Sequence, residues 1–225
     1  MLPKLTKFIQ TKNEIKIDFI QNKALELSFF LSLPASIALL IASEQITSSL
    51  FGYGSYDELS VKNSALALFY FSLGLPAFSL IKVFSSFLFA RHNTKIPFYF
   101  SLVSVFINVS ISIYFFEGIG FVIIPIATTI SSWFNALLLF LFLNKKKYYS
   151  FNLSFLTSLP RIIFSSFIMG YILNYLINFF DEKLAYNSEY KLAYLITIVL
   201  AMFIIYIVIS IFTKAFNIKD IKLKY

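Results

Sequence analysis

A lysine lies inside one of the most apolar stretches of the chain. Lys82 follows LGLPAFSLI and precedes VFSSFLFA, within a segment of membrane-spanning length (residues 73–90). A charged side chain at the centre of a membrane helix costs on the order of 3 kcal/mol, so such residues usually serve a function. Ala90 is eight residues away, or about 12 Å of helix, which exceeds the easy reach of a snorkelling lysine. We therefore predict that Lys82 offers a cation to an anionic ligand in a cavity; snorkelling or pairing with a carbonyl is the alternative.

Two amide side chains also lie in the middle of apolar segments. Asn108 and Asn135 have hydroxyl residues nearby, namely Thr128, Thr129, Ser131 and Ser132. Both asparagines are candidates for the wall of the same cavity, although such groups more often form hydrogen bonds between helices. The chain has one histidine, no cysteine and scattered carboxylates. These residues offer no basis for a metal site or a catalytic triad, so we expect neither a cofactor nor enzymatic activity.

Membrane helices must position these candidates. Of the 225 residues, 59% are hydrophobic and 13% are charged, and the mean hydropathy is +0.80, which is typical of an integral membrane protein. Six stretches approach the roughly 20 residues that a helix needs to cross a bilayer. They are continuously apolar and lack the alternation of membrane β-strands. The sequence predicts an all-α polytopic protein with six transmembrane helices, near residues 24–42, 64–90, 97–116, 119–143, 159–180 and 192–212.

The basic residues between these segments predict the orientation. Fifteen lie in alternate connections that begin with the N-terminal segment, and three lie in the intervening loops. Because lysine and arginine concentrate on the cytoplasmic side, both termini are predicted to be cytoplasmic. The net charge of +8 is then a topology signal, and no nucleic-acid partner is expected. The fifteen are Lys4, Lys7, Lys12, Lys16, Lys23, Arg91, Lys95, Lys145, Lys146, Lys147, Arg161, Lys214, Lys219, Lys222 and Lys224, against Lys62, Lys183 and Lys191.

Three segments carry a family resemblance. They read ALELSFFLSLPASIALLIASEQITSSLFGYGSYD (24–57), GLPAFSLIKVFSSFLFARHNTKIPFYFSLVSVFINVSIS (74–112) and GFVIIPIATTISSWFNALLLFLFL (120–143). The shared features are a proline turn among small residues, a lysine between Ile and Val, Phe-Ala-Arg before a Thr-Lys-x-Pro loop, and an asparagine-containing helix. The sequence resembles the MurJ/MviN family of lipid II flippases, in the multidrug/oligosaccharidyl-lipid/polysaccharide exporter superfamily. Residues 150–225 support this resemblance only through two hydrophobic segments.

The resemblance implies a larger architecture of about fourteen helices in two lobes plus a terminal pair. The six segments would be the ninth to fourteenth, so the chain is expected to be an incomplete flippase whose partner is the missing N-terminal half. The implied parts are a cytoplasmic linker with the end of a preceding helix (1–23), four helices of the C-terminal lobe (24–143), a basic cytoplasmic loop (144–158), the terminal pair (159–212) and a basic tail (213–225). An amphipathic interfacial helix is the alternative for the first part.

The resemblance also implies a substrate and a location. The substrate would be lipid II, an undecaprenyl-pyrophosphate-linked disaccharide-pentapeptide, moved across the bacterial inner membrane from the cytoplasmic to the periplasmic leaflet among the membrane lipids. Lys82, Arg91, Asn108 and Asn135 are the predicted cavity residues. Tyr175 and Tyr206, on the terminal pair, are predicted to line a groove for the lipid tail. The alternatives are a flippase for another lipid-linked oligosaccharide such as an O-antigen precursor, a polyprenyl transferase, and a non-transporting membrane subunit.

Overall fold

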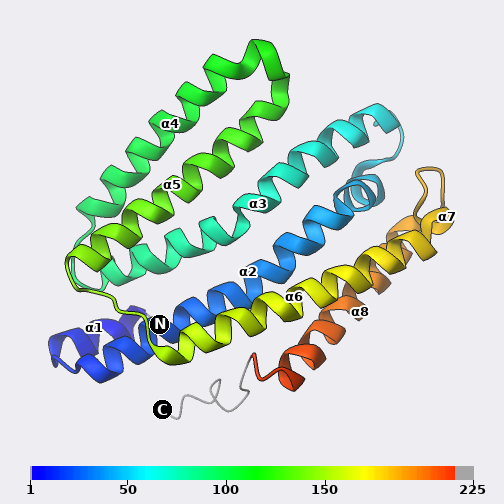
Figure 1. The fold of residues 1–225 in the computed structure, drawn as a ribbon. Helices are drawn as coiled ribbons and strands as arrows, with labels where there is room; N and C mark the ends of the chain where they lie inside the picture. The colour runs from blue at the N-terminus through cyan, green and yellow to red at the C-terminus, as the bar shows by residue number, and fades with distance from the viewer. Residues whose placement is uncertain (1, 216–225) are drawn as a thin grey trace. The chain divides into compact units, whose positions relative to one another are not determined.

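The computed structural model describes residues 2–215, and nearly all of them are helical (Figure 1). The predicted all-α class is confirmed. Met1 and residues 216–225, which include most of the predicted tail with Lys219, Lys222 and Lys224, lie outside the described residues. The helices are α1 (Leu2–Gln10), α2 (Glu14–Phe51), α3 (Glu58–Phe89), α4 (Lys95–Ile119), the 3-10 turn η1 (Gly120–Val122), α5 (Ile123–Lys145), α6 (Leu153–Phe179), α7 (Asp181–Leu184) and α8 (Lys191–Phe212).

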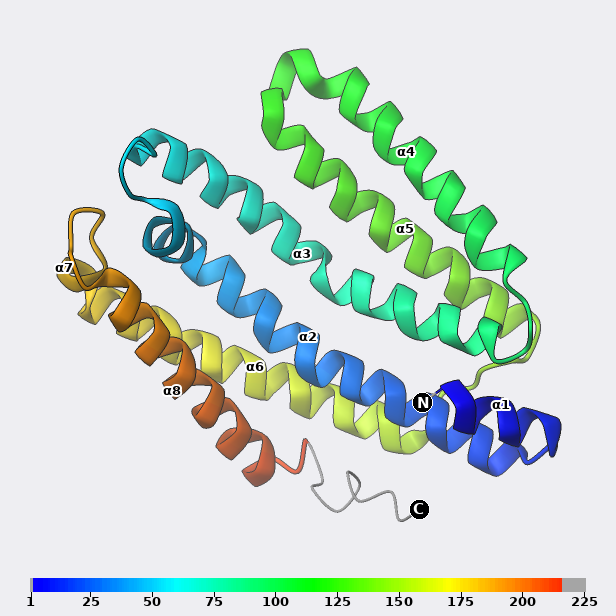
Figure 2. The same cartoon turned by 180° about the vertical axis from the view of Figure 1, so that it is seen from behind.

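Five apolar stretches in the described chain are long enough to cross a membrane. Four are single helices, α2, α3, α6 and α8. The fifth runs from Lys95 to Lys145 and contains two of the six predicted segments, as α4 and α5. These two helices lie side by side and antiparallel in both views of the ribbon (Figures 1 and 2). The reversal occurs at Gly120, whose φ of 75° suits a residue without a Cβ atom.

The first predicted segment is much shorter than the helix that contains it. Residues 24–42 form only the middle of α2, which has 38 residues and is therefore about 57 Å long. The mixed-charge residues from Glu14 onward are helical and continuous with it. Ala42 interrupts the helical geometry, with φ −105° and ψ 17°. In α1, Leu5 is fully buried while the lysines Lys4 and Lys7 are exposed, so this short helix is amphipathic.

The chain forms two compact units. Among the described residues, unit 1 comprises residues 2–32 and 74–157, and unit 2 comprises residues 33–73 and 158–215. Helices α2 and α3 each contribute one part to each unit, and the divisions fall within three residues of Pro34 and Pro76.

Aromatic and leucine side chains are prominent in the interior of unit 1. Phe84 and Phe87 of α3 lie against Tyr149, with ring centroids 6.4 and 5.9 Å apart. The hydroxyls of Ser28 and Ser79 are 2.6 Å apart and join α2 to α3.

In unit 2, α6 and α8 run side by side (Figures 1 and 2) and are linked by the hydroxyls of Ser165 and Thr213, 2.9 Å apart.

A serine hydroxyl provides the hydrogen bond that a proline removes from the backbone of α3. Pro76 has no amide proton, so the carbonyl of Ser72, four residues earlier, loses its usual helical donor. In unit 2 the hydroxyl of Ser36, on α2, donates to this carbonyl over 2.7 Å, and both residues are buried. Side-chain hydroxyls commonly satisfy freed backbone groups in this way inside membranes. The same bond holds α2 against α3.

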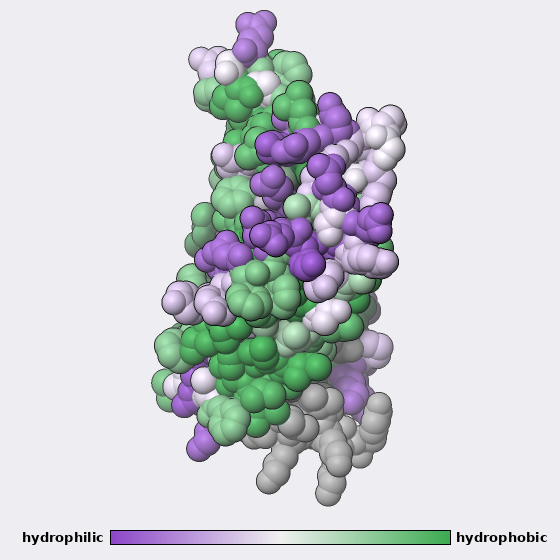
Figure 3. Space-filling model, turned by 90° about the vertical axis from the view of Figure 1, so that its right-hand side faces the viewer, coloured by the Kyte–Doolittle hydropathy of each residue, from purple (hydrophilic) through white to green (hydrophobic). Residues whose placement is uncertain are grey.

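Large apolar side chains cover much of the surface. Figure 3 shows hydrophobic residues over a wide area of one face, with hydrophilic residues gathered in its upper part. On α4, Val105, Phe106, Ile113 and Tyr114 are each more than 60% exposed. An exposed apolar surface of this extent is expected where a protein contacts lipid or another membrane helix.

The contribution of the hydrogen bond from Ser36 to the carbonyl of Ser72 can be tested with a double-mutant cycle. Ser36→Ala should lower the free energy of unfolding by about 1 kcal/mol, because the carbonyl of Ser72 then remains buried without a donor. In a Pro76→Ala background an amide proton is available, so the same change should cost less than half as much. Thermal unfolding of the purified chain in detergent would measure both costs. Equal costs in the two backgrounds would show that Ser36 does not replace the backbone donor missing at Pro76.

Candidate functional site

Lys82 is exposed on α3, and no partner holds its ammonium group among the described residues. The contact found at this residue is made by its backbone carbonyl, which accepts a 2.7 Å hydrogen bond from the hydroxyl of Ser86. A lysine in this position within a membrane helix is free to bind an anion or to extend toward the membrane surface. Both interpretations of Lys82 therefore remain consistent with its surroundings.

A groove in unit 1 lies along the same part of α3. It has a volume of about 630 Å³ and is lined by Ser85, Phe89, Thr94, Lys95, Pro97, Phe98, Tyr99 and Ser101. Lys82 precedes Ser85 by three residues and Phe89 by seven, so all three lie on one face of the helix. Lys82 thus lies on the α3 face that leads to this groove, and a second cation, Lys95 at the beginning of α4, lines the groove itself.

The two predicted asparagines bond across the α4–α5 hairpin. The amide of Asn108 donates to the hydroxyl of Thr128 over 2.9 Å and lies 3.4 Å from that of Ser131. The amide of Asn135 is 3.5 Å from the hydroxyl of Ser101, while its carbonyl oxygen is buried without a partner. Asn108 therefore makes the helix-packing contacts that polar residues commonly make in membranes, and Asn135 retains a free acceptor.

Arg91 binds backbone carbonyls at one end of unit 1. Its guanidinium donates to Phe87 over 2.9 Å and to Tyr148 over 2.8 Å, and it lies 4.6 Å from the centre of the Tyr148 ring. Burial lowers the pKa of Arg91, which still leaves it charged at neutral pH. Gln21 donates to the same Tyr148 carbonyl over 3.1 Å. Arg91 therefore fastens the loop after α5 to the loop after α3.

Asn22 completes this loop cluster, which we define as Gln21, Asn22, Arg91, Tyr148 and Tyr149. Its amide donates to the carbonyl of Ser150 over 3.0 Å, and its oxygen accepts from the hydroxyl of Tyr149 and the amide of Asn152 over 3.0 and 3.1 Å. Burial raises the pKa of Tyr149 above its usual value of 10, so this hydroxyl remains a donor.

The cluster brings together parts of three segments that are far apart in the sequence. Residues 21–22, Arg91 and residues 148–152 all belong to connections that were predicted to be cytoplasmic. The sequence alone predicts no role for Gln21 or Asn22. Two adjacent amide side chains at the edge of the first apolar run hint at a polar contact there. Their partners could not be identified from the sequence, because they lie more than 120 residues away.

The two predicted groove residues differ in exposure. Tyr175 on α6 is 63% exposed and stacks on Phe179, with ring centroids 6.4 Å apart. Tyr206 on α8 is 3% exposed. Only Tyr175 lies where a lipid tail could reach it within unit 2 as described.

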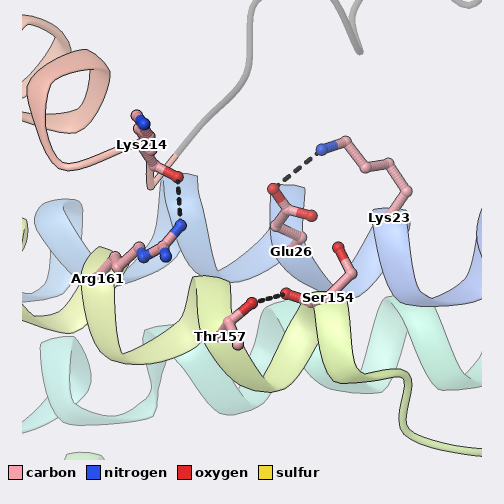
Figure 4. Close-up of polar contacts among 6 residues, drawn as sticks. All are labelled: Lys23, Glu26, Ser154, Thr157, Arg161 and Lys214. Atoms are coloured by element: carbon pink, nitrogen blue, oxygen red, sulfur yellow. Dashed lines mark hydrogen bonds and ion pairs between the residues drawn. The ribbon is translucent and has the colours of Figure 1, made fainter.

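Charged residues near the predicted cytoplasmic ends also make local contacts (Figure 4). In unit 2, Arg161 on α6 donates to the carbonyl of Lys214, just after α8, over 3.3 Å. In unit 1, Lys23 and Glu26 form an ion pair with an N–O distance of 2.9 Å within α2. The contact of Arg161 shows that the beginning of α6 and the end of α8 lie together.

Lys191 is a further residue whose burial is not predicted from the sequence. It was counted among the loop charges, but its side chain is only 1% exposed at the beginning of α8.

Comparison with known proteins decides the family. A sequence model described as "Lipid II flippase MurJ" matches residues 1–223. The chain belongs to the MurJ family. The predicted family is thereby confirmed.

Individual MurJ relatives cover less of the chain. A protein of Rhizobium meliloti named "Probable lipid II flippase MurJ" is 36% identical over 169 residues, which are 75% of this chain and 32% of that protein. A protein of Rickettsia prowazekii with the same name is 31% identical over 146 residues, or 65% of this chain and 29% of its own length. The chain thus matches about a third of the length of these curated relatives.

A solved structure shares the fold. "Lipid II flippase MurJ, inward closed conformation" matches 93% of this chain and 41% of its own chain, with a TM-score of 0.73 and 22% sequence identity. The helical arrangement therefore agrees with part of a MurJ structure.

Asn22 provides a test of the loop cluster in this MurJ family member. Asn22→Leu should lower the free energy of unfolding by about 2–3 kcal/mol, because the buried hydroxyl of Tyr149 and two part-buried backbone groups lose their partner. Asn187→Leu, at an exposed loop position of unit 2, is the matched control and should change stability little. Circular dichroism during heating would compare the two, and equal effects would argue against the cluster.

Proposed function

We propose that this chain forms part of a lipid II flippase. The main observation behind this proposal is that the MurJ family model matches residues 1–223. Because the chain corresponds to about a third of the length of its relatives, the activity is proposed for an assembly that also contains the remaining helices. Those helices would be the partner of the chain, and lipid II would be its substrate.

Lys82 is the proposed contact for the pyrophosphate of the substrate. A flippase for this lipid must offer cations to the phosphates, hydrogen-bonding groups to the sugars and an apolar path to the tail. The unpaired ammonium of Lys82 could provide a cation for the phosphates. Asn135 is the proposed hydrogen-bonding group for the sugars; its carbonyl oxygen has no partner but is buried in the chain as described, so it would have to become exposed to bind them. The contacts of Asn108 and Arg91 favour supporting roles in the same cavity wall.

We place the chain in the bacterial inner membrane with six crossings, counting α4 and α5 separately, and with both termini in the cytoplasm. The charge asymmetry supports this orientation. The loop cluster supports it further, because three basic connections meet at one end of unit 1. In unit 2, the turn after α2 meets the segment before α8, as expected of two loops on the opposite side.

The orientation can be tested by thiol labelling, because the chain has no cysteine of its own. Single cysteines at Asn93 and Tyr148 should resist an impermeant maleimide added outside intact cells, whereas cysteines at Ser55 and Asn187 should react. Disruption of the membrane should make all four sites reactive. Labelling with the reverse sidedness would overturn the orientation.

The terminal pair α6 and α8 is proposed to frame an apolar groove for the lipid tail, and α2, α3, α4 and α5 are proposed to be four helices of a C-terminal lobe. The exposure of Tyr175 supports a surface for the tail on α6. Alternating access in transporters with two halves comes from one half moving against the other around a midplane site. The chain alone is therefore not expected to transport lipid II.

A complementation experiment tests the function. In a strain depleted of its own flippase, the chain co-expressed with the remaining helices of a relative should restore lipid II export, and the chain alone should not. Lys82→Ala should reduce export more than it reduces protein level, and Lys82→Arg should retain part of it, since charge is the required property. Lys62→Ala, which removes a surface lysine paired with Glu58 over 2.9 Å, is the control.

Three outcomes would contradict these proposals. Full export with Lys82→Ala would remove the cavity role and favour snorkelling. Rescue by the chain alone would refute the need for further helices. No export from the co-expressed pair at normal protein levels would favour a non-transporting subunit, and restored growth with a different lipid-linked oligosaccharide would identify another substrate.

A further inference from the structure

The ammonium of Lys191 occupies a closed cage in unit 2. It donates to the carbonyl oxygens of Gly52 and Tyr186, both over 2.7 Å. It also lies 4.3 Å from the ring centre of Tyr53 and 4.6 Å from that of Tyr186. With two carbonyl oxygens and two aromatic faces around it, the ammonium is satisfied without a carboxylate partner.

Such a cage is built from neutral groups only, and no ion pair involves Lys191 among the described residues. A buried charge is tolerated only where hydrogen bonds and electrostatic contacts replace its hydration. The carbonyl of Gly52 lies just beyond the C-terminal end of α2, where the helix dipole favours a cation. The carbonyl oxygens and aromatic rings of the two loops therefore suit a cationic side chain at position 191.

The turn after α2 approaches the cage too closely for a larger residue. A Cβ atom on Gly52 would lie 2.6 Å from the carbonyl oxygen of Ser48, 3.0 Å from the Tyr186 ring and 3.2 Å from the ammonium of Lys191. A second bond reinforces the contact, since the hydroxyl of Tyr186 donates to the carbonyl of Tyr56 over 2.8 Å. Glycine thus permits the two loops to close around the lysine.

We propose that Lys191 is a latch that joins the turn after α2 (residues 52–56) to the segment before α8 (residues 185–190), so that the two move as one cap. The kink at Ala42 separates residues 43–51 from the rest of α2. With the latch closed, residues 43–51 move with α8, and α2 bends at Ala42. The cap opens only if the ammonium leaves its cage, and this does not depend on which lipid is transported.

Distance measurements on the full chain test the latch. Spin labels on cysteines introduced at the exposed residues Ser55 and Asn187 would report the separation of the two loops in lipid nanodiscs, by double electron–electron resonance. The otherwise unchanged chain should give one narrow distribution. Lys191→Met should give a broad one with a longer-distance population, because two carbonyls lose their donor.

Lys183→Met is the matched control, since it removes a neighbouring exposed lysine of α7 and should leave the distribution narrow. Hydrogen exchange provides a second measurement on the same variants. The amides of Gly52, Tyr56 and Ser188 form loop hydrogen bonds of 2.9, 3.2 and 3.0 Å, and Lys191→Met should make them exchange on the order of tenfold faster. Tyr53→Leu removes one ring and leaves both hydrogen bonds, so it is a milder variant that tests the cage even if Lys191→Met fails to fold. It should broaden the distance distribution to a smaller extent than Lys191→Met.

The latch would be overturned by a narrow, unshifted distribution with unchanged exchange in Lys191→Met. A narrow distribution in Tyr53→Leu would overturn the aromatic part of the cage. Equal broadening in Lys183→Met would attribute the effect to net charge at this end of unit 2 and would also refute the latch. None of these readouts involves lipid transport, so their failure is distinguishable from failure of the proposed function.

Discussion

Every polar group inside a membrane protein must find its partner within the protein, because the hydrocarbon core offers none. Hydroxyl side chains in this chain largely obey this constraint within their own helix. Thr47, Ser86, Ser166 and Thr197 each donate to the carbonyl four residues earlier. Asparagines bond across neighbouring helices and loops. Some buried uncharged atoms, such as the hydroxyl of Ser104 and the carbonyl oxygen of Asn135, also have no partner among the described residues. The exposed ammonium of Lys82 differs from them because it is an unpaired charge, and such a group gives a membrane protein free binding capacity.

Two cations among the described residues, the half-buried Arg91 and the buried Lys191, bind carbonyl oxygens and aromatic rings. Arg91 and Lys191 both follow this pattern, one in each unit. Carbonyls at helix ends carry partial negative charge and remain unsatisfied by the helix itself, so a lysine or arginine there satisfies the backbone and holds two connections together. The basic residues thus have two functions. Those in solvent are proposed to bias the orientation of the chain, whereas Arg91 and Lys191 hold connections together.

Local and distant interactions explain what could be predicted from the sequence. The all-α class and the centres of the helices follow from apolar length, which is a local property. The ends of α2 do not, because the mixed-charge residues 14–23 owe part of their order to bonds with residues 148–152. Lys191 could not be distinguished from the other loop lysines, since its cage depends on Gly52, 139 residues away. The burial of Tyr206 was likewise hidden, because an apolar helix has no polar face to indicate which side packs.

Pro76 and Ser36 illustrate why the pattern of small polar residues matters in such a chain. The proline removes a backbone donor, and the hydroxyl of Ser36 replaces it from a different helix. A local defect is thereby converted into a tertiary contact, because the freed carbonyl of Ser72 is satisfied only while α2 lies against α3. An alanine at Pro76 would restore the helical bond and leave the hydroxyl without this acceptor. The proline and the serine therefore act as a pair, which makes the packing of the two helices in unit 2 depend on an interruption of one of them.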